Sequence, residues 1–79
     1  MISCDSHDYV EIACMMRYQV RLHRVDGQVL VGEAVDIRSR SGDERLMLAT
    51  GEAIPLVNIR EMEVLSKPSY FERVIISAG

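Results

Sequence analysis

The chain has 79 residues, of which 48% are hydrophobic and 27% charged, and 12 acidic side chains outnumber 9 basic ones. This length predicts one domain, residues 1–79, whose small core buries about 60% of the surface that the unfolded chain exposes. No apolar run approaches the ~20 residues of a membrane-spanning helix, and the hydrophobic content is too high for a disordered chain. The N-terminal sequence MISCDSHDYV lacks the features of a secretory signal, so we expect a cytoplasmic protein.

The negative charge is concentrated at the N-terminus. Residues 1–16 contain Asp5, Asp8 and Glu11 and neither lysine nor arginine. The rest of the chain holds the other 9 acidic side chains and all 9 basic ones, which balance. The whole net charge of −3 therefore belongs to the first segment.

This acidic segment has the pattern of an amphipathic helix from Ser6 to Met16. Asp5 and this serine are suitable N-cap residues, while Asp8 and Glu11 fall in the first two turns, where carboxylates complement the helix dipole. At 100° per residue, the apolar side chains gather on one arc. They are Tyr9, Val10, Ile12, Ala13 and Met16. The acidic side chains project from the opposite face together with His7.

A two-residue period typical of a strand begins at Tyr18. The apolar members of the alternation are Tyr18, Val20 and Leu22, and the polar members are Gln19, Arg21 and His23. Asp26-Gly27 predicts a two-residue type I′ hairpin turn, because both residues tolerate positive φ. The return strand is expected over residues 28–37, and Gly32 within it predicts a bulge or a sharp bend.

The second half of the chain predicts further short strands. The segment RSRSGD, residues 38–43, is polar and contains glycine, so we expect a loop. Strands are expected over residues 44–50, 53–57, 61–65 and 73–77. Pro55 lacks an N–H group and therefore places its strand at a sheet edge or a bulge.

These elements predict an α+β, mainly β fold. A helix in residues 1–16 would pack on a strongly bent, five- to six-stranded antiparallel sheet formed by residues 17–79, as in a partial barrel. The helix would cover one open end of it. The side chains expected to be largely buried are Val20, Leu22, Val29, Val31, Leu46, Leu48, Val64 and Ile76.

No arrangement of residues typical of an enzyme or a metal centre occurs in the sequence. Cys4, His7, Cys14 and His23 have no spacing known from structural zinc sites. Cys14 lies toward the apolar arc and has no evident basic neighbour that would lower its pKa. The two cysteines, ten positions apart on a helix, would lie about 15 Å apart, too far for a disulfide. We therefore expect no catalysis, no metal, no cofactor and two reduced thiols.

Two surfaces remain as candidates for binding. The first is the acidic helix, whose carboxylates could also be a cap and a solvated flank. The second is a basic strand face with its neighbours, namely Arg17, Arg21, His23, Arg24, Arg38 and Arg40. A basic face of this kind can bind RNA. The sequence pI of about 5.2 and the scarcity of aromatic side chains argue against it, and neighbouring acids could neutralise these arginines.

Two segments resemble the Rho-binding antiterminator family, known as Rof. ISCDSHDYVEIAC, residues 2–14, resembles the acidic, cysteine-bracketed N-terminal helix of that family. DGQVLVGEAVD, residues 26–36, resembles the Asp-Gly hairpin and bent strand of Sm-like folds. The resemblance extends from Ile2 to about Ser77 and implies an Sm-like fold.

The resemblance also implies a function. Members of the family bind the bacterial transcription termination factor Rho, a hexameric RNA helicase, and inhibit termination. Their helix and a strand-connecting loop are set against Rho's primary RNA-binding site. Carried over by position, the partner-binding residues would be Asp5, His7, Asp8 and Glu11 on the helix and Arg38, Ser39 and Arg40 in the loop. In that loop, Ser41-Gly42 departs from the bulkier or basic residues of the family.

The expected mechanism is competition with RNA, because helix carboxylates would occupy a surface that otherwise holds phosphates. We expect neither membrane association nor direct nucleic-acid binding by this chain. Two alternatives remain open at this point. One is an Sm-like module that binds RNA through its basic strand face, and the other is an interaction domain for a different partner.

Overall fold

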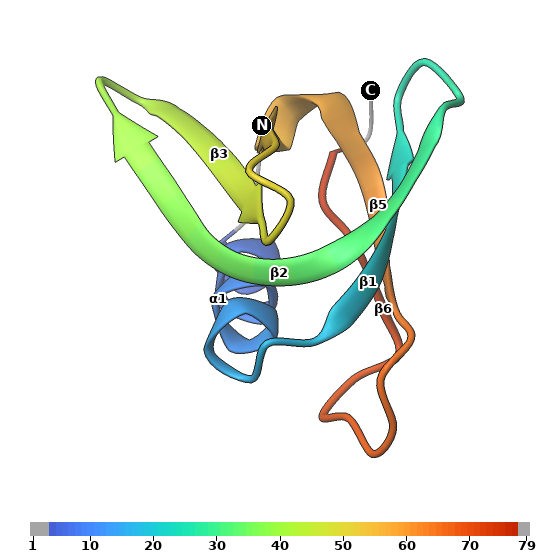
Figure 1. Cartoon of the computed structure of the whole chain (residues 1–79). Helices are drawn as coiled ribbons and strands as arrows, with labels where there is room; N and C mark the ends of the chain where they lie inside the picture. The colour runs from blue at the N-terminus through green and yellow to red at the C-terminus, as the bar shows by residue number, and fades with distance from the viewer. Residues whose placement is uncertain (1–3, 78–79) are drawn as a thin grey trace.

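A computed structural model describes the backbone of residues 4–77 and the side chains of residues 7–77. It contains one helix, α1 (Cys4–Met15), and six strands (Figure 1). The strands are β1 (Gln19–Arg24), β2 (Val29–Arg40), β3 (Asp43–Leu48), β4 (Ala53–Pro55), β5 (Ile59–Val64) and β6 (Arg73–Ile75), with a short 3-10 helix (Leu56–Asn58) between β4 and β5. This confirms the expected mainly β fold with an N-terminal helix. No helix of the described chain is both long enough and apolar enough to span a membrane.

The long strand β2 holds the sheet together. The strand order is β4-β3-β2-β1-β5-β6, and every neighbouring pair is antiparallel. The first part of β2 pairs with β1 and the second part pairs with β3, with a register irregularity between Ala34 and Asp36. Figure 1 shows β2 as a single curved ribbon that carries the sheet from one half to the other. The irregularity thus falls just after Gly32, where the sequence predicted a bulge or bend.

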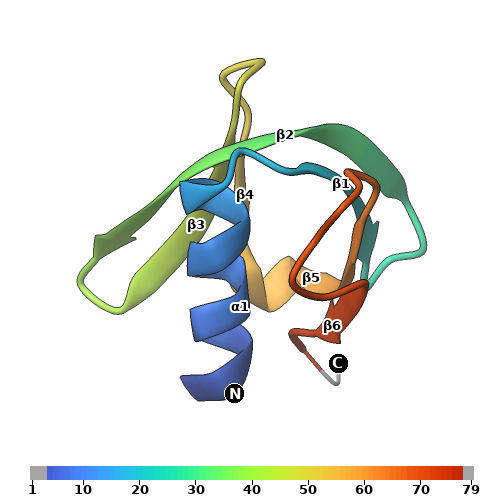
Figure 2. The same cartoon turned by 90° about the horizontal axis from the view of Figure 1, so that it is seen from below.

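Helix α1 lies on the concave side of this curved sheet (Figure 2). It begins at Cys4, so Asp5 and Ser6 belong to its first turn and do not precede it as N-caps. It ends in a Schellman motif, in which the Tyr18 N–H donates to the Ala13 carbonyl at 3.0 Å and the Arg17 N–H donates to the Cys14 carbonyl at 3.2 Å.

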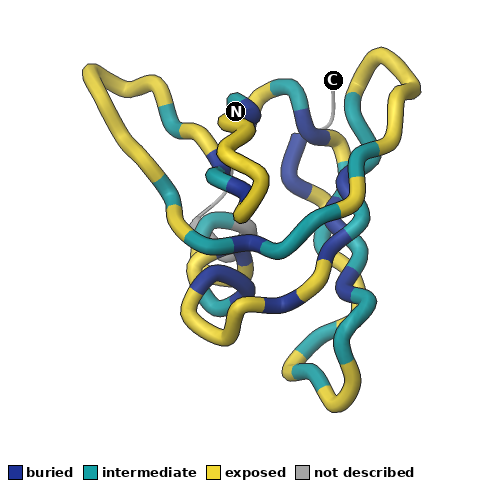
Figure 3. Tube along the Cα trace, viewed as in Figure 1, coloured by how far each residue is buried: buried dark blue, intermediate teal, exposed yellow. Residues whose placement is uncertain are grey.

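The core lies between α1 and the inner face of the sheet. Its members are Val10, Ala13, Cys14, Tyr18, Val20, Leu22, Ala34, Leu46, Leu48, Ile54, Leu56, Ile59, Met62, Val64 and Ile76. The trace coloured by burial shows the buried segments gathered at the centre and the hairpin turns exposed (Figure 3). Tyr9 and Met16, which the sequence placed on the buried arc, are more exposed; Tyr9 nevertheless packs its ring 4.9 Å from that of Phe71.

The prediction that Val29 and Val31 are buried is wrong. Their exposed fractions are 50% and 55%, because they pair with His23 and Arg21 and share the outer face of the sheet with them. In the half of β2 that pairs with β1, the inner face is formed by Leu30, Gly32 and the buried Ala34. A Cβ atom on Gly32 would lie 3.2 Å from Leu48 Cδ1, so this position brings β2 close to the core.

Two predicted turns also differ from the structure. Residues 38–40 are not a loop, because β2 continues to Arg40 and pairs with β3 up to Asp43. The connection is the two-residue turn Ser41-Gly42, in which both residues have positive φ, as a type I′ turn requires. At Asp26-Gly27 only the glycine has positive φ, and its N–H donates to the Arg24 carbonyl at 3.0 Å. That turn is longer than the predicted two residues.

The remaining strands confirm the predicted order with different bounds. β4 contains Pro55 and forms one edge of the sheet, as its missing N–H predicted. β5 begins earlier than predicted, at Ile59, and buries Met62 and Val64. β6 forms the other edge and ends before the buried Ile76. The edges of the sheet are thus short strands, and the open, curved surface between them receives the helix.

Candidate functional site

The exposed face of α1 carries three polar side chains, His7, Asp8 and Glu11, which we call the acidic helix face. Asp8 and Glu11 are exposed, and His7 is half-buried. One ligand atom from each of the three lies within 4.8 Å of the others. Asp8 has no ion pair with any other described residue. Two carboxylates one turn apart therefore face solvent on the predicted surface.

A groove of about 550 Å³ separates this face from the distal half of β2. It is lined by His7, Glu11, Cys14, Met15, Arg17, Val35, Asp36, Ile37 and Ser39. Met15 at the end of the helix and Arg17 just after it are exposed, and β2 contributes the opposite wall. A partner that contacts the helix can therefore also reach this strand.

His7 connects α1 to β3. Its Nδ1 atom lies 2.9 Å from Glu11 Oε1, one helical turn away. Its Nε2 atom lies 2.6 Å from Glu44 Oε2 on β3. The imidazole thus joins the helix to the hairpin formed by β2 and β3. Sequence analysis missed Glu44, whose proximity to His7 depends on the folded topology.

The predicted hairpin residues divide between two faces. Ser39 lines the groove beside α1. Arg38 and Arg40 lie on the other face by strand alternation, opposite Arg45 and Asp43 in the pairing register. The structure therefore brings His7, Glu11 and Ser39 together around one groove, with Asp8 beside them, and places the two arginines behind it. The side chain of Asp5 lies outside the described residues.

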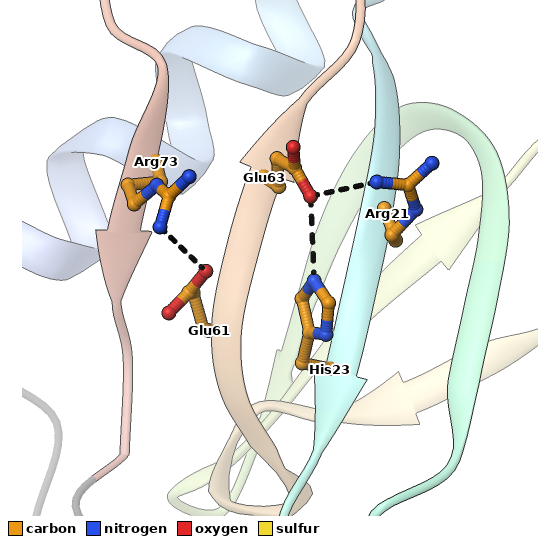
Figure 4. Close-up of polar contacts among 5 residues, drawn as sticks. All are labelled: Arg21, His23, Glu61, Glu63 and Arg73. Carbon is orange, nitrogen blue, oxygen red and sulfur yellow. Dashed lines mark hydrogen bonds and ion pairs between the residues drawn. The ribbon is translucent and has the colours of Figure 1, made fainter.

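Several basic side chains of the outer sheet face pair with acidic side chains of neighbouring strands (Figure 4). Arg21 Nη1 on β1 donates to Glu63 Oε1 on β5 at 2.9 Å, and His23 Nε2 lies 3.4 Å from the same oxygen. Hydrogen bonding to His23 and then to Arg21 lowers the pKa of the Glu63 carboxyl. On the adjacent strand Arg73 Nη1 lies 3.8 Å from Glu61 Oε2. Arg21 and Arg73 on this face are thus already paired with acidic side chains.

Cys14 lines the groove but is a poor nucleophile. Its side chain is 8% exposed, and burial, followed by the charges of Asp36 and Glu11, raises its pKa to about 12. The thiol therefore stays protonated near neutral pH, whereas nucleophilic attack needs the thiolate. No arrangement in the described residues gives Cys14 a catalytic base. His7 is committed to carboxylates, and His23 lies on the outer sheet face.

Family comparison assigns the chain to a known group. The family model described as "Modulator of Rho-dependent transcription termination (ROF)" matches residues 1–76. No curated protein is similar enough in sequence to count as a relative. Among solved structures, YaeO bound to magnesium, from Vibrio cholerae O395, is 27% identical with a TM-score of 0.78. The similarity covers 89% of this chain and 96% of the Vibrio chain.

Of the His, Cys, Asp and Glu side chains described, the one close group of three is the acidic helix face. Magnesium prefers six oxygen ligands, and two of these three residues supply oxygen. Both nitrogens of the third, His7, already face carboxylates. We therefore assign no magnesium site to this group.

The fold and the match over residues 1–76 identify the chain as a member of the ROF family of modulators of Rho-dependent transcription termination.

Proposed function

We propose that this protein inhibits termination by placing its acidic helix face on the primary RNA-binding site of Rho, so that RNA cannot load. A site that holds single-stranded RNA presents positive charge to the phosphates. Carboxylates that accept hydrogen bonds from its arginine or lysine side chains would use the same positive groups. Inhibition then needs no catalysis, and it places the protein in the cytoplasm with Rho.

The observation that carries this proposal is the exposure of Asp8 and Glu11 on one face of α1. The N-terminal segment holds the whole net negative charge of the chain. Asp8 in particular has no cationic partner among the described side chains, so its charge is available to a partner. Burial of this carboxylate in an interface has a desolvation cost, which a cation of the partner offsets when the two groups pair closely.

The groove beside α1 supports a larger contact than the helix alone. Ser39 and Ile37 of β2 form its second wall, and Met15 adds an exposed apolar side chain at the end of the helix. Arg38 and Arg40 flank this wall on the other face of the hairpin. We propose that the partner contacts the helix first and the β2–β3 hairpin second, and that Asp5 extends the acidic contact.

Direct RNA binding is the less supported alternative. It needs free arginines on the outer sheet face, whereas Arg21 and His23 share Glu63. Neither β1 nor β5, the strands that carry Arg21, His23 and Glu63, contains a tyrosine, phenylalanine or tryptophan on which a base could stack. The outer face of β1 and β5 therefore favours neither phosphate binding nor stacking.

The test is a binding measurement between the purified protein and purified Rho, made with and without a single-stranded RNA that fills the primary site. We expect the two to bind in the absence of RNA and the RNA to displace the protein competitively. A termination assay in the same buffer should show read-through that rises with protein concentration. Binding that is unchanged by saturating RNA would contradict occlusion of the RNA site.

A further inference from the structure

We infer that His7 is a positioning residue whose ring proton ties the acidic helix face to the β2–β3 hairpin. The inference rests on the proposed function, because it concerns how the two parts of that binding surface are held together. In this role the effect of His7 on binding comes through the two elements that it joins. His7 fixes the distance between the helix, which carries Asp8, and the hairpin, which carries Ser39.

The contacts of the ring support this role. Nδ1 faces Glu11 on α1 at 2.9 Å, and Nε2 faces Glu44 on β3 at 2.6 Å. Glu44 Oε2 is shielded from water and makes no conventional hydrogen bond with a described residue, so His7 is its ion-pair partner. The side chain of His7 is 30% exposed and that of Glu44 is 32% exposed. Both groups thus lie partly inside the contact between the helix and the hairpin.

The chemistry of imidazole makes this arrangement depend on a proton. Neutral imidazole has one N–H donor and one acceptor nitrogen, whereas the protonated ring donates from both. A carboxylate oxygen can only accept, so an unprotonated ring nitrogen facing it is repelled. The contacts of His7 with Glu11 and Glu44 are therefore satisfied together by the protonated ring alone.

The surrounding charges act on the same ring. Asp8 and Glu11 lie on α1 and Glu44 on β3, while Asp36 of β2 lines the same groove as His7. The one base on that groove is Arg17, which pairs with Glu33 at 3.8 Å. A ring surrounded mainly by carboxylates is attracted to both elements when it is charged. When it is neutral, one of the two contacts is lost.

An imidazole carries its second ring proton at low pH and loses it at high pH, so both contacts are satisfied together only at the low end of a pH series. The helix and hairpin should therefore be held together more firmly at the lower pH. We expect binding to Rho to weaken roughly three- to tenfold as the pH rises through this series, the effect of losing one charge-assisted contact. The loss should come from the position of the helix relative to the hairpin.

The first experiment uses the free protein. Long-range 1H–15N spectra report the protonation of the imidazole rings, and backbone spectra are recorded at the same pH values. The chemical shift of the backbone N–H of Glu44 should change with pH in parallel with the ring signals of His7. In the Glu44→Gln variant this parallel change should disappear, since the neutral side-chain amide of glutamine replaces the carboxylate that contacts His7. His23→Gln is the matched control, because His23 pairs with Glu63 on the outer face and its loss should leave the parallel change of His7 and Glu44 intact.

The second experiment measures Rho binding across the same pH range. The ratio of wild-type to Glu44→Gln affinity at each pH cancels any titration of Rho itself. This ratio should fall toward one as the pH rises, while the ratio of wild type to His23→Gln stays constant. A merely structural role would lower affinity equally at every pH.

The two arms separate failure of this inference from failure of the proposed function. A Glu44 amide that does not titrate with His7, or an affinity ratio that is flat with pH, overturns the positioning role while Rho binding stands. Absence of wild-type binding at every pH overturns the proposed function. If Glu44→Gln does not fold, Glu44→Ala and His7→Gln remove the same contact and are compared in the same two measurements.

Discussion

Arg21 and Glu63 face each other on adjacent strands, with Nη1 and Oε1 2.9 Å apart. The same carboxylate oxygen also approaches His23, so one acidic side chain contacts two basic neighbours. This arrangement separates the two charged surfaces of the molecule. Arg21 and Arg73 of the sheet are paired with acidic side chains of neighbouring strands, whereas the acidic helix face includes a carboxylate without a cation.

The first prediction concerns the affinity of the protein for single-stranded RNA. The protein should bind a single-stranded RNA oligomer no more tightly than non-specifically, with a Kd of roughly 10⁻⁴ to 10⁻⁶ M at physiological salt by analogy with non-specific DNA binding. Fluorescence anisotropy with a labelled oligomer measures this directly. Sub-micromolar affinity that is lost in an Arg21→Ala, Arg24→Ala variant would favour the RNA-binding alternative.

The second prediction concerns acid stability. Because His23 and Arg21 lower the pKa of Glu63 below its ordinary value of 4.5, the carboxylate stabilises the fold above that pH. This contribution is lost as the pH falls through the lowered pKa. Glu63→Gln should therefore lower the Tm at pH 7, and the difference should shrink as the pH falls below 4.5. Thermal denaturation followed by circular dichroism measures both values, with Glu72→Gln as a matched exposed control.

The third prediction tests the register of β2 and the core. Leu48 is buried, so Leu48→Ala should cost about 2 to 5 kcal/mol of unfolding free energy. Val31→Ala should change stability by roughly 0.5 kcal/mol or less, because Val31 lies on the exposed outer face. Urea denaturation gives both numbers. Equal costs for the two variants would contradict this assignment of inner and outer faces.

The sequence predicts the buried face of a strand only where apolar and polar residues alternate clearly along it. Val20 and Leu22 alternate with polar residues, and their burial was predicted correctly. In β2 the residues Val29, Leu30 and Val31 are all apolar, so hydrophobicity alone does not decide which face is buried. The deciding factor is the close approach of Gly32 to Leu48, a contact between residues distant in the chain. Such a contact has no local sequence signal.

The same distinction applies to the candidate site. The exposed Asp8 and Glu11 follow from helical periodicity, which is a local property. The length of the β2–β3 hairpin cannot be predicted from a local pattern. Arg38 and Arg40 are polar, exposed strand residues, and such a pattern is also typical of a loop. The pairing of His7 with Glu44 cannot be predicted in this way either, since it exists because the topology lays α1 beside β3.

The fourth prediction concerns Cys14. Its pKa of about 12 leaves about one thiol in 10⁴ ionised at pH 8. In a Cys4→Ser background, the folded protein should react slowly with a thiol-specific reagent at pH 8. Unfolding in urea should restore the reactivity of an ordinary cysteine. Rapid reaction of the folded protein would show that the groove exposes the thiolate and would reopen a chemical role for this residue.

The last prediction tests the acidic helix face directly. Asp8→Ala should leave the Tm nearly unchanged, because Asp8 is exposed and has no ion pair with a described residue. It should nevertheless weaken Rho binding, by about 2 to 5 kcal/mol if the partner's cation is left buried and unpaired. Asp8→Lys should cost at least as much. Glu11→Ala adds a smaller structural effect, since it also frees His7.

The matched control is Glu52→Ala, which removes the same charge from the β3–β4 turn, where Glu52 contacts Thr50. It should bind Rho as the parent does. Affinity of the parent should fall steeply with salt, because exposed charges are screened over about 8 Å at physiological ionic strength, and the Asp8→Ala, Glu11→Ala variant should lose part of that salt dependence. A folded double variant that inhibits termination as well as the parent would mean that these carboxylates are a solvated flank, and that the contact with Rho lies elsewhere on the surface.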